Sequence, residues 1–131
     1  MKSKNYKGPE RRTYLRLEAD YAIGYIRLSD NLHPSGDIVE DARPKDIGGA
    51  GIKILTSEQI PAGAFLEAHI KIPATSKFIT AICRVVRCEP DKKRLFSTAL
   101  AFVWIAKKDR EIIDEYVKKI KLNMLRSETK I

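Results

Sequence analysis

Two short stretches contain the residues best suited to hold an anion. Glu10–Arg16, ERRTYLR, places three arginines within six residues, and Asp46–Gly51, DIGGAG, places a carboxylate beside three glycines. Guanidinium groups match phosphate oxygens bidentately and can stack on a purine face. Glycines near a strand start let the backbone approach a ligand and turn N–H groups toward it. These residues suit a guanine nucleotide; the alternative is arginines in a solvated tail and GGAG as an ordinary turn.

The chain has 131 residues and a formal net charge of +8, and most of that excess lies at its start. The first sixteen residues contain one carboxylate, Glu10, and six basic residues, Lys2, Lys4, Lys7, Arg11, Arg12 and Arg16. A basic segment on a nearly balanced domain indicates a localised anionic partner. Residues 1–9 are polar and include Gly8 and Pro9, so we expect a flexible N-terminal arm.

Short stretches rich in apolar residues, several of them alternating with polar ones, predict six strands between about residues 20 and 105. They lie at 21–28, 37–47, 52–55, 65–72, 78–88 and 95–105. Pro44 marks the second as an edge, a bulge or a strand end. Because no helix intervenes, we expect an all-β fold, an antiparallel barrel or sandwich, within one domain at residues 10–126.

After the last strand the apolar period changes to three and four residues, which predicts a helix at about 107–125. Its apolar face is formed by Ile112, Ile113, Tyr116, Val117 and Ile120. We expect this helix to cover one open end or edge of the sheet. Trp104 is expected in the core or under the helix, and residues 127–131 are expected to fray.

Nothing in the sequence predicts secretion or membrane insertion. The first eight residues lack the apolar run of a signal peptide, and the longest apolar run, Ala99–Ala106, is too short to span a bilayer. Cys83 and Cys88 lie five residues apart on one predicted strand, so they should point to opposite faces and stay free thiols. We therefore expect a cytoplasmic protein.

No arrangement of residues predicts catalysis or a metal site. His33 lies in a turn and His69 on a predicted outward face, without metal-ligand spacing to each other or to the cysteines. The carboxylates around Asp46 define no general acid–base pair. We expect a binding protein rather than an enzyme, with no metal and no cofactor.

The order of these features resembles the PilZ domain family. RTYLR at Arg12–Arg16 fits the family's RxxxR motif, and DIGGAG at Asp46–Gly51 is similar to its second motif, (D/N)xSxxG. The later pattern also resembles the family, with PAG before the strand ending at residue 72, ICRVVR, ALAFVWI and the helix start KKDREIIDEYV. The resemblance covers roughly residues 10–120 and implies a six-stranded antiparallel split barrel with a C-terminal helix.

The resemblance also implies a ligand, because many PilZ domains are receptors for the bacterial second messenger cyclic di-GMP. Arg12 and Arg16 would then grip the phosphates and stack on guanine, while Arg11 would influence how many ligand molecules bind. Asp46 would bond a guanine or an arginine, and Gly51 would allow close approach.

One position departs from the family pattern. Gly48 stands where the motif has serine, so a hydroxyl donor is missing. A hydrogen bond to a charged group is worth roughly 1.5–3 kcal/mol, or about one to two decades of affinity. The backbone N–H of Gly48 or Gly49 could substitute for it.

Three functions remain open from the sequence. In the first, the chain binds cyclic di-GMP, its basic arm folds against the barrel, and the change is passed in trans to an unidentified protein effector. In the second, Gly48 marks a degenerate PilZ module that binds proteins without nucleotide. In the third, the chain is a small basic nucleic-acid-binding barrel, although most of its net charge lies outside the barrel.

Overall fold

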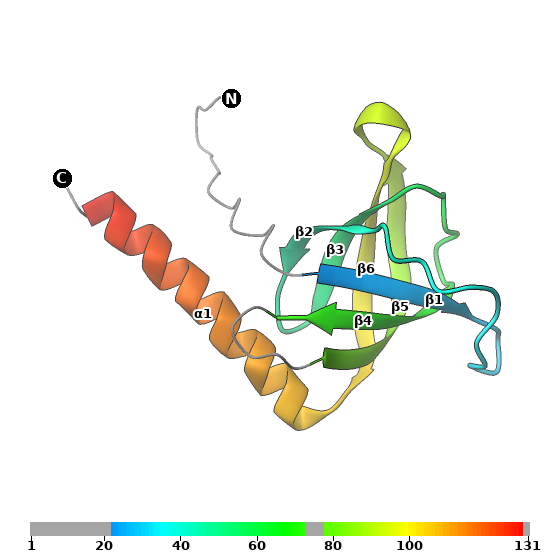
Figure 1. Ribbon diagram of the computed structural model, residues 1–131, viewed down its shortest axis with the longest axis horizontal. Coiled ribbons are helices and arrows are strands. Elements are labelled where there is room, and N and C mark those ends of the chain that lie inside the picture. The colour runs from blue at the N-terminus through cyan, green and yellow to red at the C-terminus, as the bar shows by residue number, and fades with distance from the viewer. Residues whose placement is uncertain (1–21, 73–77, 130–131) are drawn as a thin grey trace.

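The structure is a computed structural model that describes residues 22–72 and 78–129. Within these residues the chain forms strands and one long C-terminal helix (Figure 1). The strands are β1 (Ala22–Leu28), β2 (Arg43–Ile47), β3 (Gly51–Thr56), β4 (Phe65–Lys71), β5 (Phe78–Pro90) and β6 (Phe96–Ile105), and the helix is α1 (Lys107–Thr129). A short 3-10 turn, Lys92–Arg94, lies between β5 and β6.

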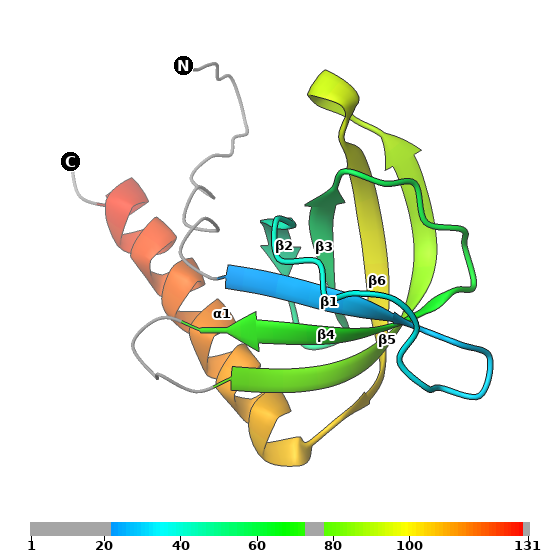
Figure 2. The same cartoon turned by 45° about the vertical axis from the view of Figure 1, so that its right-hand side comes forward.

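The six strands pair antiparallel in the order β1-β4-β5-β6-β3-β2. The sheet curls so that its two edges approach each other (Figures 1 and 2). Tyr25 on β1 exchanges two backbone hydrogen bonds, of 2.9 and 2.8 Å, with Val39, which precedes β2. This curled sheet with its C-terminal helix confirms the all-β fold expected from the sequence.

One apolar core fills the inside of the curled sheet. Alternation along β4 is regular, because Leu66, Ala68 and Ile70 are fully buried while Glu67 and His69 between them are not. The other strands contribute Ile23, Tyr25, Ile52, Ile54, Ile79, Ala81, Cys83, Val85, Leu100 and Ile105. Alternate residues of β3, β4 and the first part of β5 therefore line the inside of the sheet.

Strand β2 lies at an edge of the sheet, and its pairing with β3 shifts register between Pro44 and Asp46. Proline lacks an N–H donor, which explains why it is found at edges and bulges. Between these residues, Lys45 Nζ donates to Asp91 Oδ2 at 2.7 Å in the β5–β6 loop. That hydrogen bond, with one from the Lys92 backbone N–H, holds the pKa of the Asp91 carboxyl below its usual value.

Helix α1 crosses one open end of the barrel, and its C-terminal half extends beyond the sheet (Figures 1 and 2). Ile113 is fully buried, and Ile112, Tyr116 and Val117 pack against the core. The helix continues to Thr129, into the segment where fraying was expected. No glycine or proline follows Pro90 in the sequence, so no residue type that favours termination interrupts it.

A bulge on β5 changes where the cysteines point. Both are free thiols, as expected, but the prediction that they lie on opposite faces is wrong. The register shift between Val85 and Arg87 adds one residue to β5 and moves the inward phase by one. Cys83 is fully buried, which raises the pKa of its thiol to about 12. Cys88 also turns inward, with Sγ 3.3 Å from the Thr98 hydroxyl.

A second bulge explains the position of Trp104, which was expected in the core or under the helix but is 55% exposed. Strand β6 places Leu100 inward, and strict alternation would place Trp104 inward too. The pairing with β5 instead shifts at Val103, so that Trp104 lies opposite Ile82 and Ile105 becomes buried. The tryptophan therefore belongs to the outer surface of the sheet.

Candidate functional site

The glycine-rich stretch singled out from the sequence forms the tight turn between β2 and β3. Ile47 pairs with Ile52 at the base of the turn, and Gly48 N donates to Gly51 O at 2.9 Å. Phe102 N donates to Ala50 O at 3.0 Å, which ties the tip of the turn to β6. The four residues of the turn are therefore held from within and from the neighbouring strand.

Gly51 lies against the backbone of β6. A Cβ at this position would lie 2.1 Å from the carbonyl oxygen of Leu100, far inside any normal contact. Because the obstacle is backbone, it cannot rotate away as a side chain could. Glycine is required here by the packing of β3 on β6, whatever the turn binds.

Gly48, in contrast, has space around it. A Cβ built at Gly48 would meet no atom within 4 Å, and the residue does not adopt the left-handed conformation that favours glycine. Its backbone N–H is engaged by Gly51 O, so of the two amides that could replace a serine hydroxyl, Gly49 remains the candidate. Nothing in the fold opposes a serine at Gly48.

Asp46 lies on the exposed side of β2, two residues before the turn, and pairs in register with Lys53 of β3. A carboxylate opposite an ammonium on neighbouring strands is a favourable cross-strand pair. Asp46 is therefore presented at the surface next to the turn. The structure brings Asp46, Gly48, Gly49 and Gly51 together, whereas Arg11, Arg12 and Arg16 lie outside the described residues.

Two residues of α1 that were not expected at the site contact the turn. Arg110 Nη1 donates to the carbonyl oxygen of Gly49, and Asp114 Oδ1 lies 2.7 Å from where a Cβ of Gly49 would be. Arg110 and Asp114 are four residues apart, so they lie on the same side of the helix, next to the buried Ile113. The turn itself was predicted, but its contact with Arg110, sixty-one residues from Gly49, has no signal in the sequence.

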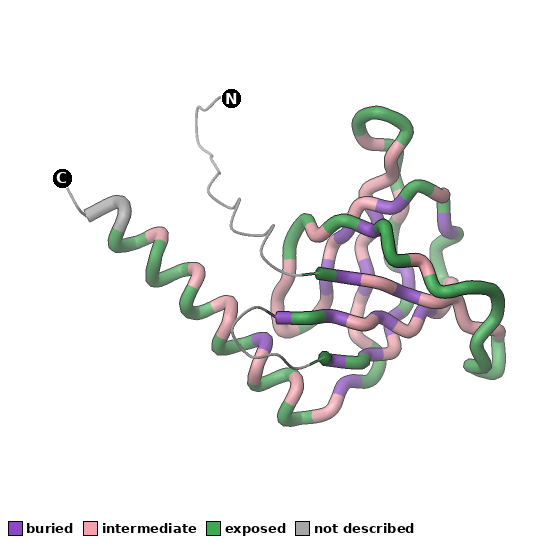
Figure 3. The backbone as a smooth tube through the Cα atoms, in the orientation of Figure 1, coloured by how far each residue is buried: buried purple, intermediate pink, exposed green. Residues whose placement is uncertain are grey.

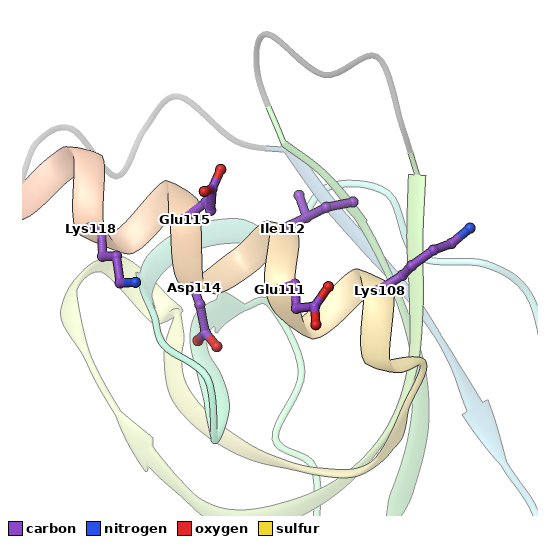
Figure 4. A pocket seen from close by; sticks show the side chains of 6 residues that line it. All are labelled: Lys108, Glu111, Ile112, Asp114, Glu115 and Lys118. Atoms are coloured by element: carbon purple, nitrogen blue, oxygen red, sulfur yellow. The ribbon is translucent and has the colours of Figure 1, made fainter.

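A solvent-open cavity of about 470 Å³ lies along the first half of α1 (Figure 4). Its described lining consists of Lys108, Glu111, Ile112, Asp114, Glu115 and Lys118. Three carboxylates outnumber two ammonium groups there, so the local charge disfavours a phosphate ligand.

The remaining candidate side chains have ordinary surroundings. His69 Nε2 lies 2.9 Å from Glu67 Oε1 on the outer face of β4, and His33 is exposed in the loop after β1. Among residues 22–72 and 78–129, no group of three or more histidine, cysteine or acidic residues is placed to hold a metal ion. No helix in the same part of the chain is long and apolar enough to cross a bilayer.

Comparison with known proteins gives a family match over most of the chain. A family model described as the PilZ domain matches residues 10–119. No curated protein matches the sequence significantly.

Two solved structures share the fold at 17% sequence identity. One is the Bacillus subtilis inhibitor of motility MotI/DgrA, with a TM-score of 0.62 over 89% of this chain and 54% of that one. The other is MrkH of K. pneumonia, with a TM-score of 0.57 over 91% of this chain and 54% of that one. The chain thus spans about half the length of each structure it matches.

The different surroundings of Gly51 and Gly48 predict different costs of substitution. Gly51→Ala should lower the free energy of unfolding by about 2–4 kcal/mol, because the new Cβ would displace the backbone of Leu100. Gly48→Ala, the matched control in the same turn, should change it by no more than about 0.5 kcal/mol. Urea denaturation of both variants measures the difference, and equal costs would contradict the packing role of Gly51.

Proposed function

The chain belongs to the PilZ domain family, and on this premise we propose that it is a cyclic di-GMP receptor that acts through a protein partner. The ligand would be held between Arg12 and Arg16 on one side and the β2–β3 turn on the other. Support comes from the RxxxR motif within the matched region and from the exposed position of Asp46 beside the turn. The combination of both motifs in one family domain carries the proposal.

The chemistry of the two motifs suits this ligand. Two arginines supply charge-assisted hydrogen bonds to the phosphodiesters and planar surfaces for stacking on guanine. Asp46 supplies an acceptor for the N–H donors of a guanine edge or orients an arginine. The glycine turn lets the ligand approach the backbone without a side chain in its path, since Gly48 has open space around it.

The contact between Arg110 and Gly49 offers a route from ligand to partner. A nucleotide seated on the turn would stiffen residues 48–51, and the hydrogen bond from Arg110 would pass that change to α1. The helix extends beyond the barrel, where a partner could detect its position (Figure 2). This mechanism needs only one contact to change strength, not a rearrangement of the core.

A second candidate, a PilZ module that binds a protein without nucleotide, is favoured by one observation. Gly48 replaces the serine of the family motif, although the fold leaves room for a hydroxyl-bearing side chain. Packing of the fold therefore does not explain the absence of the motif's serine at position 48. Nucleotide titration separates the two candidates.

Calorimetric titration of the chain with cyclic di-GMP should show saturable binding. With about 100 µM ligand a micromolar site is essentially filled, so the absence of heat there would exclude the receptor function. Arg12→Ala/Arg16→Ala should abolish binding because both phosphate contacts are lost. Arg84→Ala/Arg87→Ala is the matched control, since it removes the same charge from two exposed positions on β5 and should leave affinity unchanged.

Restoring the family serine should strengthen binding. Gly48→Ser should tighten cyclic di-GMP affinity by about 10- to 100-fold through one added hydrogen bond to a charged ligand. Gly48→Ala controls for the added Cβ and should bind like the original chain. Unchanged affinity in Gly48→Ser, measured by the same calorimetry, would show that this position does not contact the nucleotide.

Hydrogen exchange tests the route through the helix. Ligand binding should slow amide exchange in α1 around Arg110 and Asp114, whereas the interior of β4 should be unaffected. Arg110→Ala should retain nucleotide binding but lose the slowing in α1. Identical exchange of α1 with and without ligand would rule out this route.

A further inference from the structure

Helix α1 changes its charge along its length. Its first half carries both signs on the outside: the cations Lys107, Lys108 and Arg110 are exposed, as are the carboxylates of Glu111, Asp114 and Glu115. From residue 116 to residue 126 it contains no carboxylate and four exposed cations, Lys118, Lys119, Lys121 and Arg126. The exposed charge therefore changes from mixed in residues 107–115 to purely basic in residues 116–126.

The basic half also exposes apolar side chains on one face. Lys118, Lys121, Leu122 and Leu125 are spaced i, i+3, i+4 and i+7, which aligns them along one side of a helix. The exposed fractions of Leu122 and Leu125 are 51% and 56%. We call these four residues the lysine–leucine face. It combines two leucines with two cations within two helical turns.

This face is not the side by which the helix joins the barrel. Ile113, Val117, Ile120 and Met124 form a separate stripe, in which Ile113 is buried and the others are half-buried. A helix advances 100° per residue, so this stripe lies roughly opposite Leu122 and Leu125. The two leucines are therefore not part of the core. The helix already has one apolar side for packing on the barrel, so that packing does not explain leucines on another side.

Ordinary helix electrostatics does not account for all of the cations. Attraction to the helix dipole is confined to the last turn, whereas Lys121 lies eight residues before the end at Thr129. Lys118 follows Asp114 by four residues, a favourable spacing, but Lys121 has Val117 and Leu125 at its i−4 and i+4 positions. Lys121 is therefore explained neither by the helix dipole nor by an ion pair with a residue four positions away.

We propose that the lysine–leucine face binds an anionic lipid surface. On a helix lying in the membrane interface, lysines reach lipid phosphates along their aliphatic stems while leucines between them enter the acyl boundary. The C-terminal half of α1 is largely exposed and projects from the barrel, so a flat surface can reach it (Figure 3). Charge complementarity selects acidic headgroups.

A second copy of the chain fits this face poorly. Pairing two such helices through Leu122 and Leu125 would bring the lysines of both copies together, whether the helices ran parallel or antiparallel. Like charges at that distance oppose association. An anionic bilayer instead neutralises the cations, and it requires no complementary groove for two leucines.

Vesicle co-sedimentation of the full chain without nucleotide tests the proposal. Binding should be strong to vesicles of phosphatidylglycerol and phosphatidylcholine, weak to phosphatidylcholine alone, and reduced at high salt. Because residues 1–16 also carry six basic residues, the decisive quantity is the effect of substitutions in the helix. Lys118→Gln/Lys121→Gln should lower the partition coefficient about 30-fold, at about fivefold for each cation.

Two further variants separate specific docking from general charge. Leu122→Ala/Leu125→Ala should lower partitioning at least tenfold while preserving the helix, since alanine is a strong helix former. Lys92→Gln/Lys93→Gln is the matched charge control, because it removes two exposed lysines from the β5–β6 loop, far from α1 (Figure 1). This control should lower the partition coefficient by less than one third of the fold-change caused by Lys118→Gln/Lys121→Gln.

Circular dichroism confirms that each variant is folded. Equal losses in the helix variants and the loop control would overturn the proposal, as would leucine substitutions without effect. Binding of polyglutamate or nucleic acid that depends on Lys118 and Lys121, with no vesicle binding, would assign the face to another kind of partner and also overturn it. The proposal does not depend on nucleotide binding, so failure of one leaves the other standing.

Discussion

The close approach of Gly51 to the carbonyl of Leu100 is the contact on which the candidate site depends. It lets the first residue of β3 pack directly on the backbone of β6, in register with Ala101. From that point the turn of residues 48–51 is closed by its own hydrogen bond and tied to Phe102. The pairing of β2 with β3 then determines where Asp46 emerges. A side chain at Gly51 would disturb all of these positions together.

Helix α1 connects this turn with a remote part of the surface. Ile113 anchors the helix in the core, while its neighbours Arg110 and Asp114 contact Gly49. The C-terminal half of α1 extends past the sheet (Figure 1). A rigid helix fixed at one end moves its free end more than its anchored end. A small rotation of α1 at its anchored end would therefore displace its far half more than its near half.

Regular periodicity made much of the fold predictable. The alternation in β4, the edge position of Pro44 and the three- and four-residue period of α1 each depend on local sequence, and each is observed. The two bulges were not predictable, because an extra residue in a strand depends on its pairing partner rather than on its own sequence. They reversed the expected orientations of Cys88 and Trp104.

The candidate site shows the same division between local and long-range causes. Its glycine-rich turn was visible in the sequence, and the structure places Asp46 beside it. The contact of Arg110 with Gly49 was not visible, because it joins residues far apart in the chain. The reasons for the glycines also had to come from three-dimensional packing, since neighbouring glycines in one turn look alike in sequence.

The different packing of Gly48 and Gly51 changes what the motif at Asp46–Gly51 indicates about ligand binding. Gly51 is required by strand packing, so its presence supports the fold and carries no information about a ligand. Position 48 is unconstrained by packing, so a side chain there could face a bound ligand without disturbing the fold. The glycine at position 48 is thus a difference from the family motif that the packing of the fold does not require. Affinity for a nucleotide is expected to depend on position 48, whereas stability is expected to depend on position 51.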